Sequence, residues 1–423
     1  MKKSRLDDMI KKLEGLEHLD RPSIEAFQLK RLNELLVKEK KRGGFYGNLP
    51  EKLTSLEELE TLPFTGPGEL EQYGSRMLLC SQSEIQKIIT DRTSGTTGKP
   101  KRLFYTAADL EHTVLLFAAG LGEFIYPGSR TLICMPFSGP YGLGELIAEA
   151  VTRLGAVPLP AGPFLTYGEY AGIIEKEQPD TYVGMPVQLL SILRFCGQGS
   201  LKRALISGDA CPDVVVKKCE ELLGSKLFPH YGSREMALGG AVTCPAHEGM
   251  HLRENHVIAE IIDSQGKVLP RGQYGELVIT TIGMEAQPLI RYRTGDYTRI
   301  LDGKCTCNSE VLRLDTIRRK TNDFLPYIWD LDNLLFEYEN VVDYHASGLS
   351  CDTSCPEDNG FCQRGLLDIR LLVRKECNTD DIRNELTEKY RDWKVSVTLE
   401  KCTDTSCSLY TGKRSVKIKS VSE

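Results

Sequence analysis

The sequence has no long hydrophobic run and only two tryptophans among its 423 residues. Its longest apolar stretch, residues 114–121, is too short to span a bilayer, which takes about 20 residues. A surplus of positive charge is also missing, because the net charge is -6. We therefore expect neither a membrane protein nor a protein that holds nucleic acid on a basic surface.

We also expect no leader segment. Met1–Arg5 is basic, but no apolar run follows it, so no signal peptide is predicted and a cytoplasmic location is expected. Cysteine, in contrast, is abundant, with 14 residues. A secreted disulfide scaffold would be a shorter chain with a leader, so clustered cysteines are expected to be metal ligands or small buried residues.

Length and periodicity predict a layered α/β protein of two or three domains. An amphipathic helix is predicted over 21–42, with Pro22 at its start and Gly43 after its end. Short apolar strands then alternate with helices, which favours a largely parallel sheet. The strands are expected at Thr131–Met135, Thr181–Gly184, Ala204–Ser207, Val257–Asp263 and Leu277–Thr281, and the helices at 106–120, 143–153, 168–177, 186–195 and 213–223.

Two further regions depart from this alternation. The turn Ser264–Lys267 joins two consecutive strands, which predicts a small antiparallel or barrel-like piece. After about residue 320 the pattern is that of a small α+β domain. Its elements are expected to be a helix at 331–338, a Cys/Gly-rich loop at 347–365, a strand at 366–373, a helix at 379–390 and a strand at 394–399. We therefore predict a large domain, 1–319, and a small C-terminal domain, 320–423.

A phosphate-binding loop is the strongest local signal. Glycines let the backbone approach an anion closely, hydroxyls donate hydrogen bonds, and lysines supply charge. It is no Walker A loop, because only two residues separate Gly95 from Gly98 and Pro100 follows Lys99. The mixture of groups favours phosphate binding over a plain polar turn. The residues concerned are Thr93, Ser94, Gly95, Thr96, Thr97, Gly98, Lys99 and Lys101.

This loop resembles that of the adenylate-forming superfamily, which includes acyl-CoA synthetases, carrier-protein adenylation domains and luciferases. Five later segments carry the resemblance in the expected order. They are Ile206–Ala210, His230–Glu235, Tyr292–Asp296, Arg318–Asp323 and Tyr410–Arg414. In the fourth segment Lys320 stands where the family has arginine, so a bidentate contact does not carry over to it, and Arg319 is a candidate substitute.

The resemblance implies a role for each segment. Glu235 would hold the Mg²⁺ that bridges the ATP phosphates, and a carboxylate is a suitable hard ligand. Tyr231 would stack on adenine, Asp296 would bind both ribose hydroxyls, and Lys413 would reach the reacting carboxylate and α-phosphate. The small domain would be a mobile lid. The other implied nucleotide contacts are Ser207, Gly208, Asp209, Gly232, Ser233, Arg234, Arg319 and Lys320.

Within the superfamily the sequence is similar to the phenylacetate-CoA ligase group. Three segments carry this closer similarity, and they are Tyr231–Met236, Cys244–Glu254 and Pro288–Asp296. The similarity makes an aryl acid a candidate substrate.

The second of these segments also suggests a metal site. Cys244, Cys305, Cys307 and one histidine would make a tetrahedral Cys3His zinc site, with ordinary buried cysteines as the alternative. His251 has the spacing of the related motif, whereas His247 makes a tighter Cys-x-x-His chelate, so both remain candidates. No role is assigned to the remaining clustered cysteines, Cys351, Cys355, Cys362, Cys402 and Cys407.

The expected function is ATP-dependent activation of a carboxylic acid to acyl-AMP. Thioester formation with coenzyme A would follow. The expected cofactors are ATP, Mg²⁺, coenzyme A and a structural Zn²⁺, and a homodimer is compatible with the sequence. Two alternatives stay open: an adenylating enzyme that serves a carrier protein, and a non-catalytic nucleotide-binding regulator.

Overall fold

The computed structural model describes residues 4–91, 101–319, 325–350, 365–375, 377–410 and 413–420. The chain divides into two compact units, one of residues 1–129, 137–158 and 228–320, the other of residues 130–136, 159–227 and 321–423. The predicted mixed α/β fold class is confirmed. The division into domains 1–319 and 320–423 stays a prediction, because the second unit joins 321–423 to earlier segments. No helix among the described residues has the length and apolarity needed to cross a membrane.

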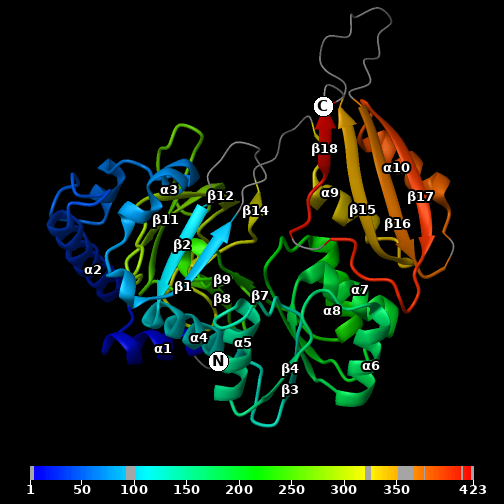
Figure 1. The fold of residues 1–423 in the computed structure, drawn as a ribbon, viewed down its shortest axis with the longest axis horizontal. Coiled ribbons are helices and arrows are strands. Elements are labelled where there is room, and N and C mark those ends of the chain that lie inside the picture. The colour runs from blue at the N-terminus through cyan, green and yellow to red at the C-terminus, as the bar shows by residue number, and fades with distance from the viewer. Residues whose placement is uncertain are drawn as a thin grey trace, which may run out of the picture. The chain divides into compact units, whose positions relative to one another are not determined.

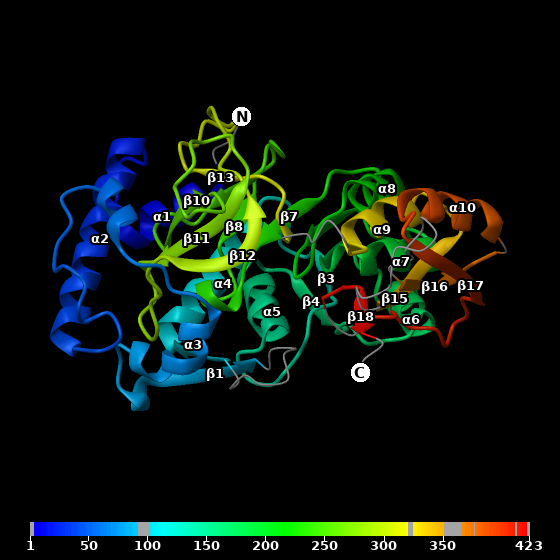
Figure 2. The same ribbon diagram turned by 90° about the horizontal axis from the view of Figure 1, so that it is seen from above.

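The first unit combines helices with antiparallel sheet. β1 and β2 form a hairpin, β10, β11, β12 and β14 form a four-stranded sheet in that order, and β13, β9, β8 and β7 also pair antiparallel. α4 and α5 lie side by side (Figure 2). The elements are α1 (Arg5–Glu14), α2 (Arg21–Arg42), α3 (Pro67–Tyr73), β1 (Ile85–Asp91), β2 (Lys101–Thr106), α4 (Ala107–Leu121), α5 (Leu143–Arg153), β7 (Phe228–Tyr231), β8 (Ala241–Thr243), β9 (Met250–Leu252), β10 (Val257–Ile262), β11 (Gly275–Thr281), β12 (Tyr292–Thr298), β13 (Arg313–Leu314) and β14 (Arg318–Arg319).

The second unit has a parallel sheet, β3–β5–β6, and a C-terminal sheet in the order β17–β16–β15–β18 with α10 packed on it (Figure 1). One apolar core joins α7 and α8 to α9 and β15. The elements are β3 (Arg130–Ile133), α6 (Tyr167–Glu177), β5 (Thr181–Gly184), α7 (Pro186–Cys196), β6 (Arg203–Ile206), α8 (Asp213–Leu223), α9 (Ile328–Leu335), β15 (Val341–Ser350), β16 (Gly365–Val373), α10 (Thr379–Lys389), β17 (Trp393–Lys401) and β18 (Lys417–Ser420), while β4 (Val157–Pro160) crosses the boundary between units.

The predicted elements are present with small shifts at their ends. The helix over 21–42 is α2, because Asp20 caps its first turn through the amide of Ser23 and Gly43 ends it at a φ of 65°. The expected antiparallel piece is the β10–β11 pair. One expectation was wrong in part: residues 347–350 of the predicted Cys/Gly-rich loop belong to β15. The rest of that loop, with Cys351, Cys355 and Cys362, lies almost wholly outside the described residues.

A buried ion pair holds the start of β12. Arg291 has a φ of 48°, and its guanidinium donates to both carboxylate oxygens of Glu260, at 3.1 and 2.8 Å. The same guanidinium donates to the backbone oxygens of Glu60 and Leu62 and lies 4.1 Å from the ring centre of Phe64. Because these contacts satisfy the buried charge from several sides, they fix the left-handed turn from which β12 begins.

We expect Glu260→Ala to lower the free energy of unfolding by about 3–5 kcal/mol, because it leaves the Arg291 charge buried without its carboxylate. A denaturant titration measures the loss. Glu149→Ala is the matched control, since Glu149 pairs with Arg153 at the surface, and its change should stay below about 1 kcal/mol. Equal losses in the two variants would contradict this account of β12.

Candidate active site and metal centre

Glu235, the predicted magnesium ligand, lies in a short 3₁₀ helix (Arg234–Met236) just after β7 and is 8% exposed. Its Oε1 atom receives two contacts: Lys101 Nζ lies at 2.6 Å and the hydroxyl of Tyr292 donates at 3.1 Å. Burial by itself raises the pKa of Glu235, but the charge and hydrogen bond of Lys101 outweigh it, so the pKa is lowered. The site therefore contains an ionised carboxylate beside a cation that comes from the edge of the predicted phosphate loop.

A second tyrosine–carboxylate contact lies in the same unit. Tyr231, the last residue of β7, donates from its hydroxyl to Asp296 Oδ2 at 2.9 Å. Asp296 lies on β12, directly opposite Arg319 of β14 in the strand register. The structure thus brings together three residues that the sequence assigned to nucleotide binding. Two segments are therefore cross-linked, one with Tyr231 and Glu235 and the other with Tyr292 and Asp296. The hydroxyl of each tyrosine donates to the carboxylate of the other segment.

Glycine makes both segments possible. A Cβ atom at Gly232 would lie 2.2 Å from the backbone oxygen of Leu238, so the turn after β7 admits no other residue. The backbone oxygen of Ser233 accepts from the amides of Met236 and Leu238, and these two hydrogen bonds close the turn. The backbone oxygen of Arg234 accepts a hydrogen bond from the hydroxyl of Tyr105 at 2.7 Å.

On β12, Gly295 has a φ of 73°, next to an irregularity in the pairing with β11. The glycine turns the strand locally just before Asp296.

The second unit carries the predicted residues of two other segments. Ser207, Gly208 and Asp209 directly follow β6, and Gly208 has a φ of 86°. Lys413 is exposed, and the next amide, that of Arg414, donates to Asp209 Oδ2 at 2.9 Å. The loop expected beside adenine therefore contacts the segment of the expected catalytic lysine.

Most of the predicted phosphate loop lies outside the described residues. Its last member, Lys101, lies within them as the first residue of β2 and makes the contact with Glu235. The predicted site residues beyond the described ranges are Thr93, Ser94, Gly95, Thr96, Thr97, Gly98, Lys99 and Lys320.

Sequence reasoning missed Tyr292 and Arg414 as parts of this arrangement. A signal for Tyr292 was present, because Tyr231 and Glu235 have the same four-residue spacing as Tyr292 and Asp296. That repeated spacing of tyrosine and carboxylate is compatible with the crossed contacts that the structure shows. Arg414 gave no such signal, since its partners lie far away along the chain.

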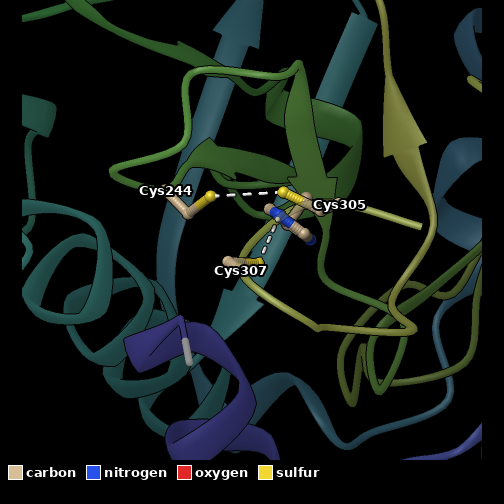
Figure 3. Close-up of side chains that lie close together, drawn as sticks. Cys244, Cys305 and Cys307 are labelled. Carbon is tan, nitrogen blue, oxygen red and sulfur yellow. Dashed lines mark hydrogen bonds between the residues drawn. The ribbon is translucent and has the colours of Figure 1, made fainter. Parts of the chain in front are cut away.

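Four of the five predicted zinc ligands gather in one place (Figure 3). The ligand atoms of Cys244, His251, Cys305 and Cys307 all lie within 4.8 Å of one another, and all four residues are buried. The sulfur atoms of Cys244 and Cys305 are 3.7 Å apart, and Cys307 Sγ is 3.5 Å from His251 Nε2. The ring of His247 instead packs at 4.5 Å from that of Phe228.

These distances fit a tetrahedral zinc ion. Zn–S bonds of about 2.3 Å and Zn–N bonds of about 2.0 Å put two sulfurs about 3.8 Å apart and a sulfur–nitrogen pair about 3.5 Å apart. Burial lowers the pKa of His251 to about 4, with a smaller contribution from Arg313, so its imidazole is neutral as a metal ligand must be. The donor set and its spacing therefore suit zinc.

Comparison with known proteins gives the chain its family. The AMP-binding enzyme family matches residues 92–285. A phenylacetate-coenzyme A ligase of Aromatoleum evansii is 31% identical over an alignment of 310 residues, and the match covers 68% of this chain and 69% of the relative. The chain belongs to this family of AMP-binding ligases. The resemblance predicted from the nucleotide-binding segments is thereby confirmed, as is the expected class of acid–thiol ligase, whereas the roles of single residues remain predictions.

A second relative and a solved structure are also similar to this chain. A phenylacetate-coenzyme A ligase of Thermus thermophilus is 29% identical over an alignment of 332 residues, and the match covers 73% of this chain and 73% of the relative. The structure of a 2-hydroxyisobutyryl-CoA ligase, in the postadenylation state with 2-HIB-AMP, superposes with a TM-score of 0.76 at 18% identity. The superposition covers 94% of this chain and 90% of the other chain. At an identity of 18%, this superposition shows that the two proteins share a fold.

We expect Lys101→Met to raise the pKa of Glu235, because burial then acts without the opposing charge and hydrogen bond of the lysine. In the parent ligase the lowered pKa makes Glu235 stabilising above about pH 4.5, and this contribution is lost as the pH falls. In the variant Glu235 contributes less stability at the same pH, because its pKa is higher. The loss of stability, about 1–3 kcal/mol for a buried acceptor that loses its partner, should therefore be largest near neutral pH and shrink in acid.

Thermal unfolding between about pH 4 and 8 measures this loss. Lys217→Met is the control, since Lys217 pairs with Glu221 at the surface and should show little change at any pH. A loss in Lys101→Met that does not depend on pH would contradict the assigned coupling between Lys101 and Glu235.

Proposed function

We propose that this ligase joins a carboxylic acid to AMP with release of pyrophosphate, and then transfers the acyl group to the thiol of coenzyme A. The crossed contacts of Tyr231 with Asp296 and of Tyr292 with Glu235 carry the proposal. These contacts hold the carboxylates of Asp296 and Glu235 in the same unit, and we assign the two carboxylates different roles. One would accept hydrogen bonds from ribose hydroxyls, and the other would ligate a cation at the phosphates.

The first step needs an attack by one anion on another. The carboxylate oxygen of the acid bonds to the α-phosphorus, the bond to the bridging oxygen breaks, and pyrophosphate leaves with the electron pair. Charge repulsion is the main obstacle, so preorganised positive groups supply the catalysis. Lys101 and Lys413 are the described lysines assigned to this work. Magnesium, when bound, supplies further charge neutralisation at the phosphates, and the ionised carboxylate of Glu235 fits a hard cation.

The second step exchanges one acyl bond for another. The thiol sulfur of coenzyme A bonds to the acyl carbon, AMP leaves from it, and the thiol proton is released. No side chain of the protein has to act as a nucleophile. The choice of coenzyme A as acceptor is supported by the names of the related ligases from Aromatoleum evansii and Thermus thermophilus. The same names support an aryl acid as substrate.

We expect Lys413→Ala to slow acyl-AMP formation by about 100-fold or more, because the variant lacks a positive group for the transition state. Thioester formation from preformed acyl-AMP should change little. Pyrophosphate exchange measures the first step, and product analysis with added acyl-AMP measures the second. Lys417→Ala is the control, since Lys417 is an exposed lysine of the same terminal segment. Equal losses in both half-reactions would count against the role of Lys413.

We also propose a structural zinc ion at Cys244, Cys305, Cys307 and His251. The ligands come from two segments that lie far apart in the sequence, and a metal would join them. Its removal should lower thermal stability more than it lowers the rate of the surviving enzyme.

The purified ligase should carry about one zinc per chain by elemental analysis. Cys305→Ser and His251→Ala should lose the metal and unfold at a lower temperature, whereas His247→Ala and Lys101→Ala should keep it. An active, folded preparation without any transition metal would refute the site.

A further inference from the structure

Arg414 directly follows Lys413, yet the two residues have opposite surroundings. Lys413 is exposed, whereas Arg414 is 6% exposed. The Arg414 guanidinium donates to Asp343 at 2.8 Å and to Asp332 at 3.0 Å. It also lies 4.4 Å from the ring centre of Tyr410. A side chain held in this way fixes the backbone beside the exposed lysine.

The two carboxylates around Arg414 are themselves held in place. Asp332, on α9, accepts from the hydroxyl of Tyr344 at 2.7 Å. Asp343, on β15, accepts through Oδ2 from the amide of Leu409 at 2.9 Å. The terminal segment is therefore attached to β15 both before and after Lys413, and Asp343 makes both attachments.

The backbone of Arg414 makes a third attachment. Its amide donates to Asp209 Oδ2 at 2.9 Å, while Asp209 Oδ1 accepts from the amide of Ala210. Asp209 belongs to the loop that follows β6. The segment beside Lys413 is thus tied to that loop as well as to α9 and β15, all within the second unit.

This arrangement is costly as a source of stability alone. One carboxylate is enough to neutralise a guanidinium, and a second one leaves a negative charge in a buried place. Burial raises the pKa of Asp332 to about 6 even though Arg414 opposes the rise. Arg194, another buried arginine of this unit, is held differently, since it donates to the backbone oxygens of Phe336 and Tyr338, and burial lowers its pKa to about 10. The carboxylates around Arg414 instead raise the pKa of that guanidinium.

We infer that Arg414 is a positioning residue for Lys413: its contacts with Asp332, Asp343 and Asp209 hold the lysine in place for acyl-AMP formation. The inference rests on the proposed function. It assigns the arginine no contact with substrate, so it should act only when Lys413 is present.

A double-mutant cycle tests this dependence. Arg414→Ala should lower kcat for pyrophosphate exchange by about 10- to 100-fold, with the KM for ATP changed by less than about threefold. Arg414→Lys should restore part of the rate, since it keeps the charge but not the planar fork. In the Lys413→Ala background, Arg414→Ala should have almost no further effect on kcat.

Arg194→Lys is the matched control for a general loss of structure. It should lower the unfolding temperature and change kcat by the same factor with or without Lys413. Equal factors for Arg414→Ala in the two backgrounds would overturn the inference while leaving the proposed function intact. A parent protein that exchanges no pyrophosphate with any acid would instead refute the proposed function itself.

Discussion

The crossed pair of tyrosine–carboxylate contacts is the interaction on which the site depends. Tyr231 and Glu235 lie at the end of one strand and just after it, Tyr292 and Asp296 belong to another, and each tyrosine bonds the carboxylate of the other segment. Both tyrosines are buried, so each contact also satisfies a hydroxyl that would otherwise lack a partner in an apolar place. Neither carboxylate can move far without disturbing the other segment.

The surrounding structure supports these two segments from outside. The buried pair of Arg291 and Glu260 fixes the turn where β12 begins, and the close approach at Gly232 fixes the turn after β7. The cysteine and histidine cluster lies in the same unit and joins the segment around β9 to the loop after β12. In the second unit, Arg414 has a comparable position beside Lys413. Buried polar groups thus hold the backbone next to each of these candidate functional residues.

Sequence patterns predict the regular elements well and the long-range contacts poorly. α2 is found where apolar periodicity and end signals place it, and α5 where periodicity alone places it, since these signals are local. β15 was missed although a local signal was present, since Val342, Tyr344 and Ala346 alternate with polar residues as in a half-buried strand. Glu235 and Asp296 were identified through family resemblance, but their bonds to tyrosines 57 and 65 residues away depend on strand packing. The repeated four-residue spacing of tyrosine and carboxylate is compatible with these bonds but does not specify them.

The balance of products tests the central claim most directly. The ligase would be incubated with ATP, coenzyme A and a panel of aryl and aliphatic acids, and every product would be measured by mass spectrometry. The account predicts that at least one acid yields acyl-CoA, AMP and pyrophosphate in equal amounts, and acyl-AMP when coenzyme A is left out. Formation of ADP and phosphate, or no acid-dependent consumption of ATP at all, would contradict it.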